Sequence, residues 1–147
     1  MQTITTFLWF EKDAERAVEL YLSLFDGEVL DLSRNPDGTA FVIHWRMGGS
    51  EYRAINGGAH FALTPAVSLY ADADDQARID ELWNALTAGG GQESQCGWLV
   101  DRFGLSWQIV PTHLGELMQG SNGEAVTAAL MGMGKIVIAE LEAASRA

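Results

Sequence analysis

The stretch that decides the fold is TFLWFEKDAERAVELYLSLFDG, residues 6–27, because the chain contains a second version of it. The second copy is SLYADADDQARIDELWNALTAGG, residues 68–90, and it aligns with the first without a gap, 62 residues further along. The copies share an acidic residue, a basic residue, two leucines, an aromatic position and a glycine: Asp13/Asp75, Arg16/Arg78, Leu20/Leu82, Leu24/Leu86, Tyr21/Trp83 and Gly27/Gly89. Such self-similarity indicates one supersecondary unit used twice.

Each copy predicts a strand followed by a helix. The strands are expected over 5–10 and 67–71. The carboxylates of Asp13 and Asp75 then suit the first free N–H groups of a helix. Helical spacing gives each helix one apolar face, made of Ala14, Ala17, Val18, Tyr21 and Phe25 in the first and of Ile79, Leu82, Trp83 and Leu86 in the second. The two shared glycines are predicted to end the helices in the left-handed conformation.

Strand-like segments follow each helix. They cover 28–33, 39–47 and 51–55 in the first copy, and 94–100 and 105–110 in the second. The sequence therefore predicts an α+β fold of two βαβββ modules, which form curved mixed sheets around a cleft. We place the modules at residues 1–62 and 63–111, within one compact domain. A C-terminal helical extension, 112–147, carries the apolar pattern of one long helix or two shorter ones.

Charge and cysteine content limit the partners. The net charge of -11 disfavours nucleic acid and anionic lipid, so we expect neither nucleic acid nor membrane as a partner. Cys96 is the only cysteine, so it forms no intramolecular disulfide and suits a reducing compartment. The opening residues lack a basic n-region, and no apolar run approaches the roughly 18 residues of a membrane span. The expected location is the cytoplasm.

Four segments carry a resemblance to a known family. They are FLWFEKDAERAVELYLSLF near the start, INGG at Ile55–Gly58, CGWLVDRFGLSWQIVP at Cys96–Pro111 and MGMGKIVIAELEAA near the end. Together they resemble the PhnB-like, or demethylubiquinone-methyltransferase-like, branch of the vicinal-oxygen-chelate superfamily, which includes glyoxalase and bleomycin-resistance proteins. The resemblance spans nearly the whole chain. It implies two curved sheets around a small-molecule cleft, usually in a homodimer.

The parent superfamily typically holds a divalent metal with four side chains, mostly His and Glu, from the first and last strands of each module. Those positions fall near Thr5 and Thr6, near Val67 and Ser68, and at Arg53 and Gln108. Arginine is no metal ligand, and no imidazole or carboxylate remains. We therefore expect a pocket with no metal and no cofactor.

The same positions give candidate ligand contacts. Thr6, Arg53, Ser68 and Gln108 would line the pocket floor, where Arg53 could bind a carboxylate or phosphate through its fork of donors. The alternative is that Arg53 pairs with an acid such as Glu51 and that Gln108 binds backbone. Further pocket candidates are His60, at the mouth, and Trp107. No catalytic residue is assigned, because His44 alone on a strand and Cys96 without a nearby base are more typical of structural residues.

Two functions fit this reading. One is a small-molecule enzyme that works without a metal through polar pocket residues. The other is a binding or sequestering protein of the bleomycin-resistance type, in which an acidic dimer holds a cationic or aromatic compound. The net charge favours a cationic ligand, whereas Arg53 favours an anionic one. A methyltransferase of the doubly wound type is not supported, because Gly132-Met133-Gly134 is not preceded by a strand.

Overall fold

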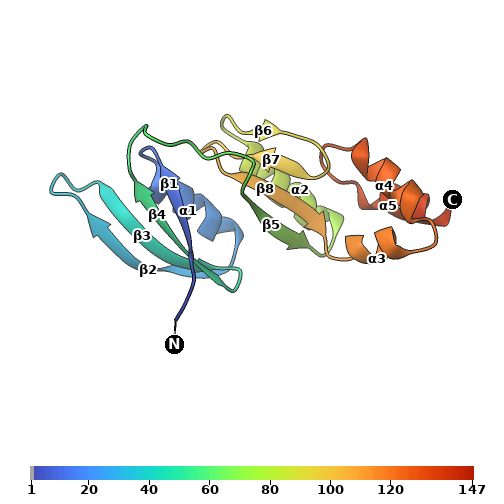
Figure 1. The fold of residues 1–147 in the computed structure, drawn as a ribbon, viewed down its shortest axis with the longest axis horizontal. Helices are drawn as coiled ribbons and strands as arrows, with labels where there is room; N and C mark the ends of the chain where they lie inside the picture. The colour runs from blue at the N-terminus through green and yellow to red at the C-terminus, as the bar shows by residue number, and fades with distance from the viewer. Residues whose placement is uncertain (1) are drawn as a thin grey trace. The chain divides into compact units, whose positions relative to one another are not determined.

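The structure is a computed structural model that describes residues 2–147 and divides into two compact units, one ending at Leu63 and the other starting at Thr64. Each unit contains a four-stranded mixed sheet, with strand order β1-β4-β3-β2 in the first and β5-β8-β7-β6 in the second (Figure 1). In each sheet one pair is parallel, β1 with β4 and β5 with β8. The α+β prediction of two repeated modules is confirmed.

The first unit is built from β1 (Thr6–Phe10), α1 (Ala14–Leu24), β2 (Gly27–Arg34), β3 (Ala40–Met47) and β4 (Ser50–Asn56). Helix α1 packs against one face of the sheet, and its predicted face is buried at Ala14, Ala17, Val18 and Tyr21. The strands contribute the other half of this core, with Leu8, Phe10, Ile43, Trp45 and Met47 buried. The opposite face of the sheet is covered by no helix of its own unit.

Two local predictions in the first unit are wrong. The side chain of Asp13 makes no cap hydrogen bond; instead Asn56 Oδ1, from the end of β4, accepts the first helical N–H, that of Ala14, at 2.8 Å. Gly27 does not end α1 in the left-handed conformation but begins β2, where a Cβ would collide with the carbonyl oxygen of Arg46. Both positions are thus determined by partners far away in sequence rather than by local pattern.

Strand β3 also departs from simple alternation. Ala40 and Val42 pair with the consecutive residues Arg34 and Ser33 of β2, so Phe41 is the extra residue of a bulge. Phe41 is 43% exposed, whereas Ile43, two residues along the strand, is buried.

The second unit repeats the arrangement with β5 (Ser68–Ala73), α2 (Gln76–Thr87), β6 (Gln92–Glu93), β7 (Trp98–Val100) and β8 (Ser106–Pro111). The predicted cap is present, since Asp75 accepts a hydrogen bond from the N–H of Arg78. The apolar face of α2 is buried as predicted, and Trp83 is 1% exposed. Gly89 has a φ of +72°, as a left-handed residue after a helix should.

The strand expected over 94–100 is interrupted. Cys96 and Gly97 both have positive φ, and their N–H groups donate to the carbonyl oxygens of Met133 and Gly134, at 2.7 and 2.8 Å. These donors therefore tie the sheet to the C-terminal segment instead of extending the ladder. A Cβ on Gly97 would meet Ile136, which explains why glycine is needed there.

The C-terminal extension forms three short helices, α3 (Leu114–Gln119), α4 (Gly123–Met131) and α5 (Ile138–Arg146), all packed within the second unit. Their apolar residues form a cluster with Val110 at the end of β8, made of Val126, Leu130, Met133, Ile136 and Leu141. Gln76 clamps the segment between α4 and α5, donating to the carbonyl of Ile136 and accepting from the N–H of Ile138. The apolar residues of the C-terminal extension are thus buried within their own chain. Among residues 2–147, no helix is both long and apolar enough to cross a membrane.

The assignment of the α1 cap to Asn56 rather than to Asp13 can be tested by measuring the free energy of unfolding. Asn56→Ala removes the acceptor for the Ala14 N–H and the donor to the carbonyl of Ala40, so we expect a loss of about 1–2 kcal/mol in the free energy of unfolding. Asp13→Ala, the matched control, removes only an exposed pair with Arg16 and should cost less than about 0.5 kcal/mol. Urea unfolding of both variants is the measurement, and equal losses would contradict the assignment of the cap to Asn56.

Candidate functional site

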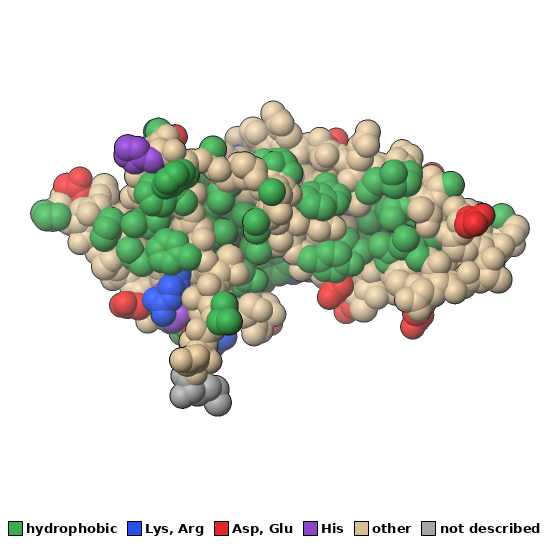
Figure 2. All heavy atoms as spheres, viewed as in Figure 1, with side chains coloured by type: hydrophobic (Ala, Val, Ile, Leu, Met, Phe, Trp, Pro, Cys, Tyr) green, Lys and Arg blue, Asp and Glu red, His purple; other side chains and the backbone are tan. Residues whose placement is uncertain are grey.

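The candidate site is the open face of the first sheet. Because side chains alternate along a strand, every second residue of β1, β4 and β3 points away from α1. One row crosses all four strands at the same register: Phe7 lies beside Arg53, Arg53 opposite His44, and His44 opposite Asp31. The next row contains Trp9, Ile55, Val42 and Ser33. In the space-filling view, hydrophobic side chains gather over this unit beside basic and histidine side chains (Figure 2).

Arg53 is the unusual member of this face. It is only partly exposed, and within the described part of the chain its guanidinium makes no hydrogen bond and no ion pair. Its neighbour on β1 is Phe7, which is 53% exposed. The predicted alternative, a pair with Glu51, is not formed, because Glu51 contacts His44.

The other lysines and arginines in residues 2–147 either have a carboxylate or ring partner or are exposed to water. Those with a carboxylate partner within 4.0 Å are Arg16, Arg34, Arg46, Arg78 and Lys135. The guanidinium of Arg102 lies 4.9 Å from the centre of the Phe103 ring. Lys12 and Arg146 are exposed to water. Among the described cations, Arg53 alone combines partial burial with the absence of a carboxylate or ring partner, so it is the cation best placed to bind an external anion.

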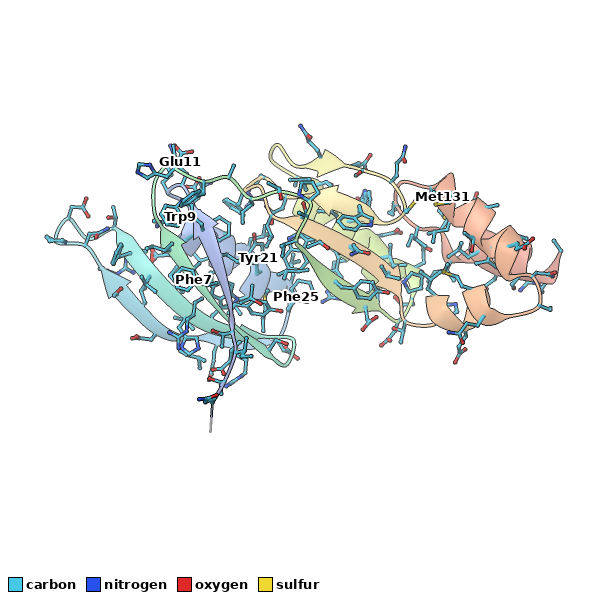
Figure 3. All side chains as sticks on the ribbon, viewed as in Figure 1. Phe7, Trp9, Glu11, Tyr21, Phe25 and Met131 are labelled. Atoms are coloured by element: carbon cyan, nitrogen blue, oxygen red, sulfur yellow. The ribbon has the colours of Figure 1, made fainter. Side chains whose placement is uncertain are left out.

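Aromatic side chains border Arg53 along β1. Phe7 and Trp9 lie on the open side of the strand, whereas Tyr21 belongs to the helix side (Figure 3). The indole of Trp9 is fixed: its Nε1 donates to the carbonyl of Gly58 at 2.9 Å, and its ring meets Phe61 edge-on with centroids 5.0 Å apart. A Cβ on Gly57 would collide with the same ring. The INGG segment therefore folds over Trp9 and holds it.

Two contacts between a basic and an acidic side chain share the face. Arg46 Nη2 lies 2.8 Å from Glu28 Oε1, and His44 Nε2 lies 3.2 Å from Glu51 Oε1. The side chain of His44 is 17% exposed, so the imidazole is sheltered but reaches the surface. Because Arg46 is matched by Glu28, the carboxylate of Glu51 is left to the imidazole. Sequence reasoning treated His44 as a lone strand histidine, because the pair depends on the register of β3 with β4.

Among the described residues, the open face of the second sheet carries no cation, unlike the open face of the first sheet, which carries Arg46 and Arg53. Ser68 and Gln108, both predicted site residues, are brought together, with Gln108 Nε2 donating to Ser68 Oγ at 3.0 Å. Tyr70 and Asp72 share this side of β5. Desolvation raises the pKa of the Tyr70 phenol, and the Asp72 carboxylate adds to the rise, so the phenol is a neutral donor at pH 7. These side chains offer hydrogen bonds but no cation.

Other predicted residues lie away from Arg53. Thr6 shares the side of β1 that carries Leu8 and Phe10, so Phe7 takes the position beside Arg53. His60 is exposed in the segment that follows β4. Trp107 is buried in the core and donates from Nε1 to Asp101 Oδ2 at 3.0 Å. Asp101 Oδ1 also accepts the N–H groups of Phe103 and Leu105, which explains the DRFGLSW string as a turn that supports β7 and β8.

The metal of the wider superfamily does not fit these donors. Phe7 and Arg53 occupy the relevant strands of the first sheet, and Ser68, Tyr70 and Gln108 those of the second. Arginine and phenylalanine are no ligands, and the neutral hydroxyl and amide groups at these positions are weak ones. In residues 2–147 no three His, Cys, Asp or Glu side chains are grouped so that they could hold a metal ion.

A hollow of about 830 Å³ lies elsewhere, between the end of α3 and the first turns of α4. Its only ionisable side chain is Glu124, and the other lining residues include Met118, Ser121, Asn122 and Thr127. It is an open groove without a cation or a nucleophile. A second hollow, of about 400 Å³, is lined in part by Asp74, Asp75, His113 and Glu142, and its described lining also contains no lysine or arginine.

Comparison with known proteins gives the family. Residues 2–110 match the family described as 3-demethylubiquinone-9 3-methyltransferase. A PhnB protein from Bacillus cereus, described as a candidate member of that methyltransferase group, is 33% identical; the match covers 76% of this chain and 100% of that one, with a TM-score of 0.70. No curated protein matches.

More distant structures share the fold. A glyoxylase/bleomycin resistance protein/dioxygenase domain from Frankia is 15% identical over 76% of this chain and 92% of that chain, with a TM-score of 0.50. The fosfomycin resistance protein FosX from Listeria monocytogenes is 12% identical over 74% and 91%, with a TM-score of 0.55. These two structures show a shared fold. The family model and the PhnB protein show that the chain belongs to the PhnB-like family described as 3-demethylubiquinone-9 3-methyltransferase.

Proposed function

We propose that this protein binds a small organic anion on the open face of its first sheet, with Arg53 as the anchor and without a metal. The observation that carries the proposal is the guanidinium of Arg53, which is partly buried and has no counter-ion in the described part of the chain. Shielding a charge from water without a partner costs free energy. A carboxylate or phosphate that accepts two parallel N–H bonds from the guanidinium would offset that cost.

The neighbours of Arg53 suggest the rest of the ligand. Phe7 on one side and the fixed indole of Trp9 in the next row are apolar surfaces beside a charged group. Ligand sites commonly combine apolar walls with a few polar contacts that fix orientation. The proposed ligand is therefore an organic anion with an aromatic or aliphatic tail. FosX, which shares the fold, was crystallised with Mn(II) and sulfate, and an anion alone suits the donors found here.

A sequestering role for a cationic or aromatic compound is the second candidate. It is favoured by the net charge of -11 and by the exposed rings of Phe7 and Phe61. A cation at this face would have to lie beside the guanidinium of Arg53, because Glu51 and Glu28 already contact His44 and Arg46. Asp31, opposite His44, is a carboxylate of this face that would favour a cation, whereas the partly buried Arg53 favours the anion proposed above.

Arg53→Gln tests the anchor. We expect it to weaken binding of 4-phenylbutanoate at least about tenfold, because a charge-assisted pair contributes roughly 1.5–3 kcal/mol. The matched control is Arg46→Gln, which removes the same charge from the same face but at a residue already paired with Glu28. Calorimetric titration of both variants and the parent is the measurement. Equal losses in both variants would mean that net charge, and not Arg53, governs binding.

The metal-independent part of the proposal has its own test. Protein purified without chelator should contain well under one equivalent of zinc, nickel, iron or manganese per chain, because Arg53 and Gln108 stand where metal ligands would be needed. Elemental analysis gives the ratio directly. One equivalent of any of these metals would overturn the assignment of the ligand positions.

We also propose that the protein is a homodimer that works in the cytoplasm, where its single thiol would stay reduced. The apolar residues of the C-terminal helices are buried within their own chain and are not available for a dimer interface. The exposed sheet edges are therefore the surface that supports dimer formation. Strand β2 is an edge strand, and two of its apolar side chains, Val29 and Leu30, are exposed. Exposed apolar edges are normally covered in soluble proteins. A stable interface of this kind needs more than about 1,000 Å² of buried surface.

Light scattering at micromolar concentration measures the assembly. The expected mass is twice the chain mass of 16.0 kDa. Leu30→Lys should shift the mass toward that of one chain, because it places a charge on the exposed edge while leaving the helix side of β2 intact. A parent mass of one chain would refute the dimer, and an unchanged dimer in the variant would move the interface away from β2.

A further inference from the structure

We propose that His44, oriented by Glu51, transfers a proton to and from the anion that Arg53 holds. The inference rests on the proposed function, because it needs a ligand at Arg53. It adds to that function a reaction and a substrate class: a 2-oxo carboxylate with an apolar tail. His44 is the catalytic residue in this scheme, and Glu51 is a positioning residue that acts through the imidazole.

The register of the sheet brings the groups together. His44 on β3 and Arg53 on β4 are direct partners of an antiparallel pair, and such partners have Cβ atoms about 4.5–5.5 Å apart on the same face. A ligand atom one or two bonds from a carboxylate held by Arg53 therefore lies within reach of the imidazole. Phe7, on the far side of Arg53, offers surface for the tail.

One nitrogen of the imidazole lies beside a carboxylate. Nε2 is 3.2 Å from Glu51 Oε1 without hydrogen-bond geometry, and the negative charge of the carboxylate favours the tautomer with the proton on Nε2, which leaves the lone pair on Nδ1. A carboxylate in this position also stabilises the imidazolium that forms when Nδ1 accepts a proton. The charged groups that face His44 are Glu51 and Arg53 on β4, Asp31 on β2 and Arg46 on its own strand.

The structure also explains why Glu51 is available. Its direct partner across the sheet is Arg46, the residue that would ordinarily bind it. Arg46 instead contacts Glu28 on β2 at 2.8 Å. As a result, Glu51 contacts His44, and Arg53 has no carboxylate partner among the described residues. The His44–Glu51 contact and the unpaired guanidinium of Arg53 therefore follow from the same set of ion-pair choices.

The step needs no oxidant, reductant or metal. The Nδ1 lone pair of His44 forms a bond to a hydrogen on the carbon next to the ketone, and the electron pair of the broken C–H bond moves into the carbonyl, whose oxygen becomes an enolate. The guanidinium of Arg53 stabilises the added negative charge. Return of the proton from Nδ1 to the same carbon restores the ketone. The proton is proposed to leave from carbon because protons bound to oxygen or nitrogen exchange with water rapidly without a catalyst, so an enzyme is not needed to move them.

Exchange in D₂O tests the scheme with 2-oxo-4-phenylbutanoate as the probe. Its C3 protons should be replaced by deuterium faster with the protein than without it, as followed by proton NMR. His44→Gln should slow this catalysed exchange at least about a hundredfold, because general acid–base groups typically contribute at least that factor. The matched control is His113→Gln, which breaks a similar histidine–carboxylate contact, His113 with Glu142 at 3.3 Å, in the other unit. That variant should exchange the probe at the parent rate.

Binding is measured separately with 4-phenylbutanoate, which has the carboxylate and the tail but no ketone. His44→Gln should bind it as the parent does, while Arg53→Gln should lose both binding and exchange. Glu51→Gln should lower kcat for exchange with little change in KM, and Glu51→Asp should restore part of kcat, which a purely structural role would not predict.

The outcomes separate the two proposals. Binding of 4-phenylbutanoate without catalysed exchange of the oxo acid would overturn the role of His44 and leave the anion site standing. Exchange that survives in His44→Gln would have the same meaning. Failure of both compounds to bind the parent protein would overturn the proposed function, and the proton transfer with it.

Discussion

The register between β3 and β4 is the constraint on which the rest of the first unit depends. It is set by the need to bury Ile43, Trp45 and Ala54 against α1, because a slip of one residue would turn this apolar set to water. Once these residues are buried against α1, strand alternation places their neighbours on the opposite, open face. His44, Arg53 and Glu51 are brought together on the open face as a consequence of packing on the other.

The family motifs belong mainly to the scaffold. INGG supplies the Asn56 side chain that caps α1 and the glycines that leave room for Trp9. The CGW…DRFG…W string provides the backbone donors that hold the C-terminal segment and the Asp101 carboxylate that binds Trp107. Asp101 is 3% exposed, and its hydrogen bonds compensate for the burial of its charge. The site proposed here lies outside these strings, on β3 and β4.

Sequence reasoning predicted the two modules and both helices, because these depend on hydrophobic period and on an internal repeat. Arg53 became a candidate through the family resemblance, and its role stays a prediction. Sequence reasoning grouped Thr6 with Arg53 on one pocket floor, whereas the direct partner of Arg53 on β1 is Phe7. It missed the His44–Glu51 contact, which requires the register of two strands and the diversion of Arg46 to Glu28. It also assigned the first helix cap to Asp13, since nothing local reveals that Asn56 approaches from β4. Residue types were readable from the sequence, but their neighbours across strands were not.

Within residues 2–147, the guanidinium of Arg53 has no counter-ion, and the proposed function depends on this cation. Its most direct test is an NMR titration of the arginine side-chain Nε–H signals with 4-phenylbutanoate, in which the Arg53 signal is identified by its absence from the spectrum of Arg53→Lys. The account predicts a saturating shift of the Arg53 signal, with the signals of Arg34, Arg46 and Arg78 unchanged because their carboxylate partners already occupy them. An Arg53 signal that stays in place at saturating ligand, or a uniform shift of all arginine signals, would contradict it.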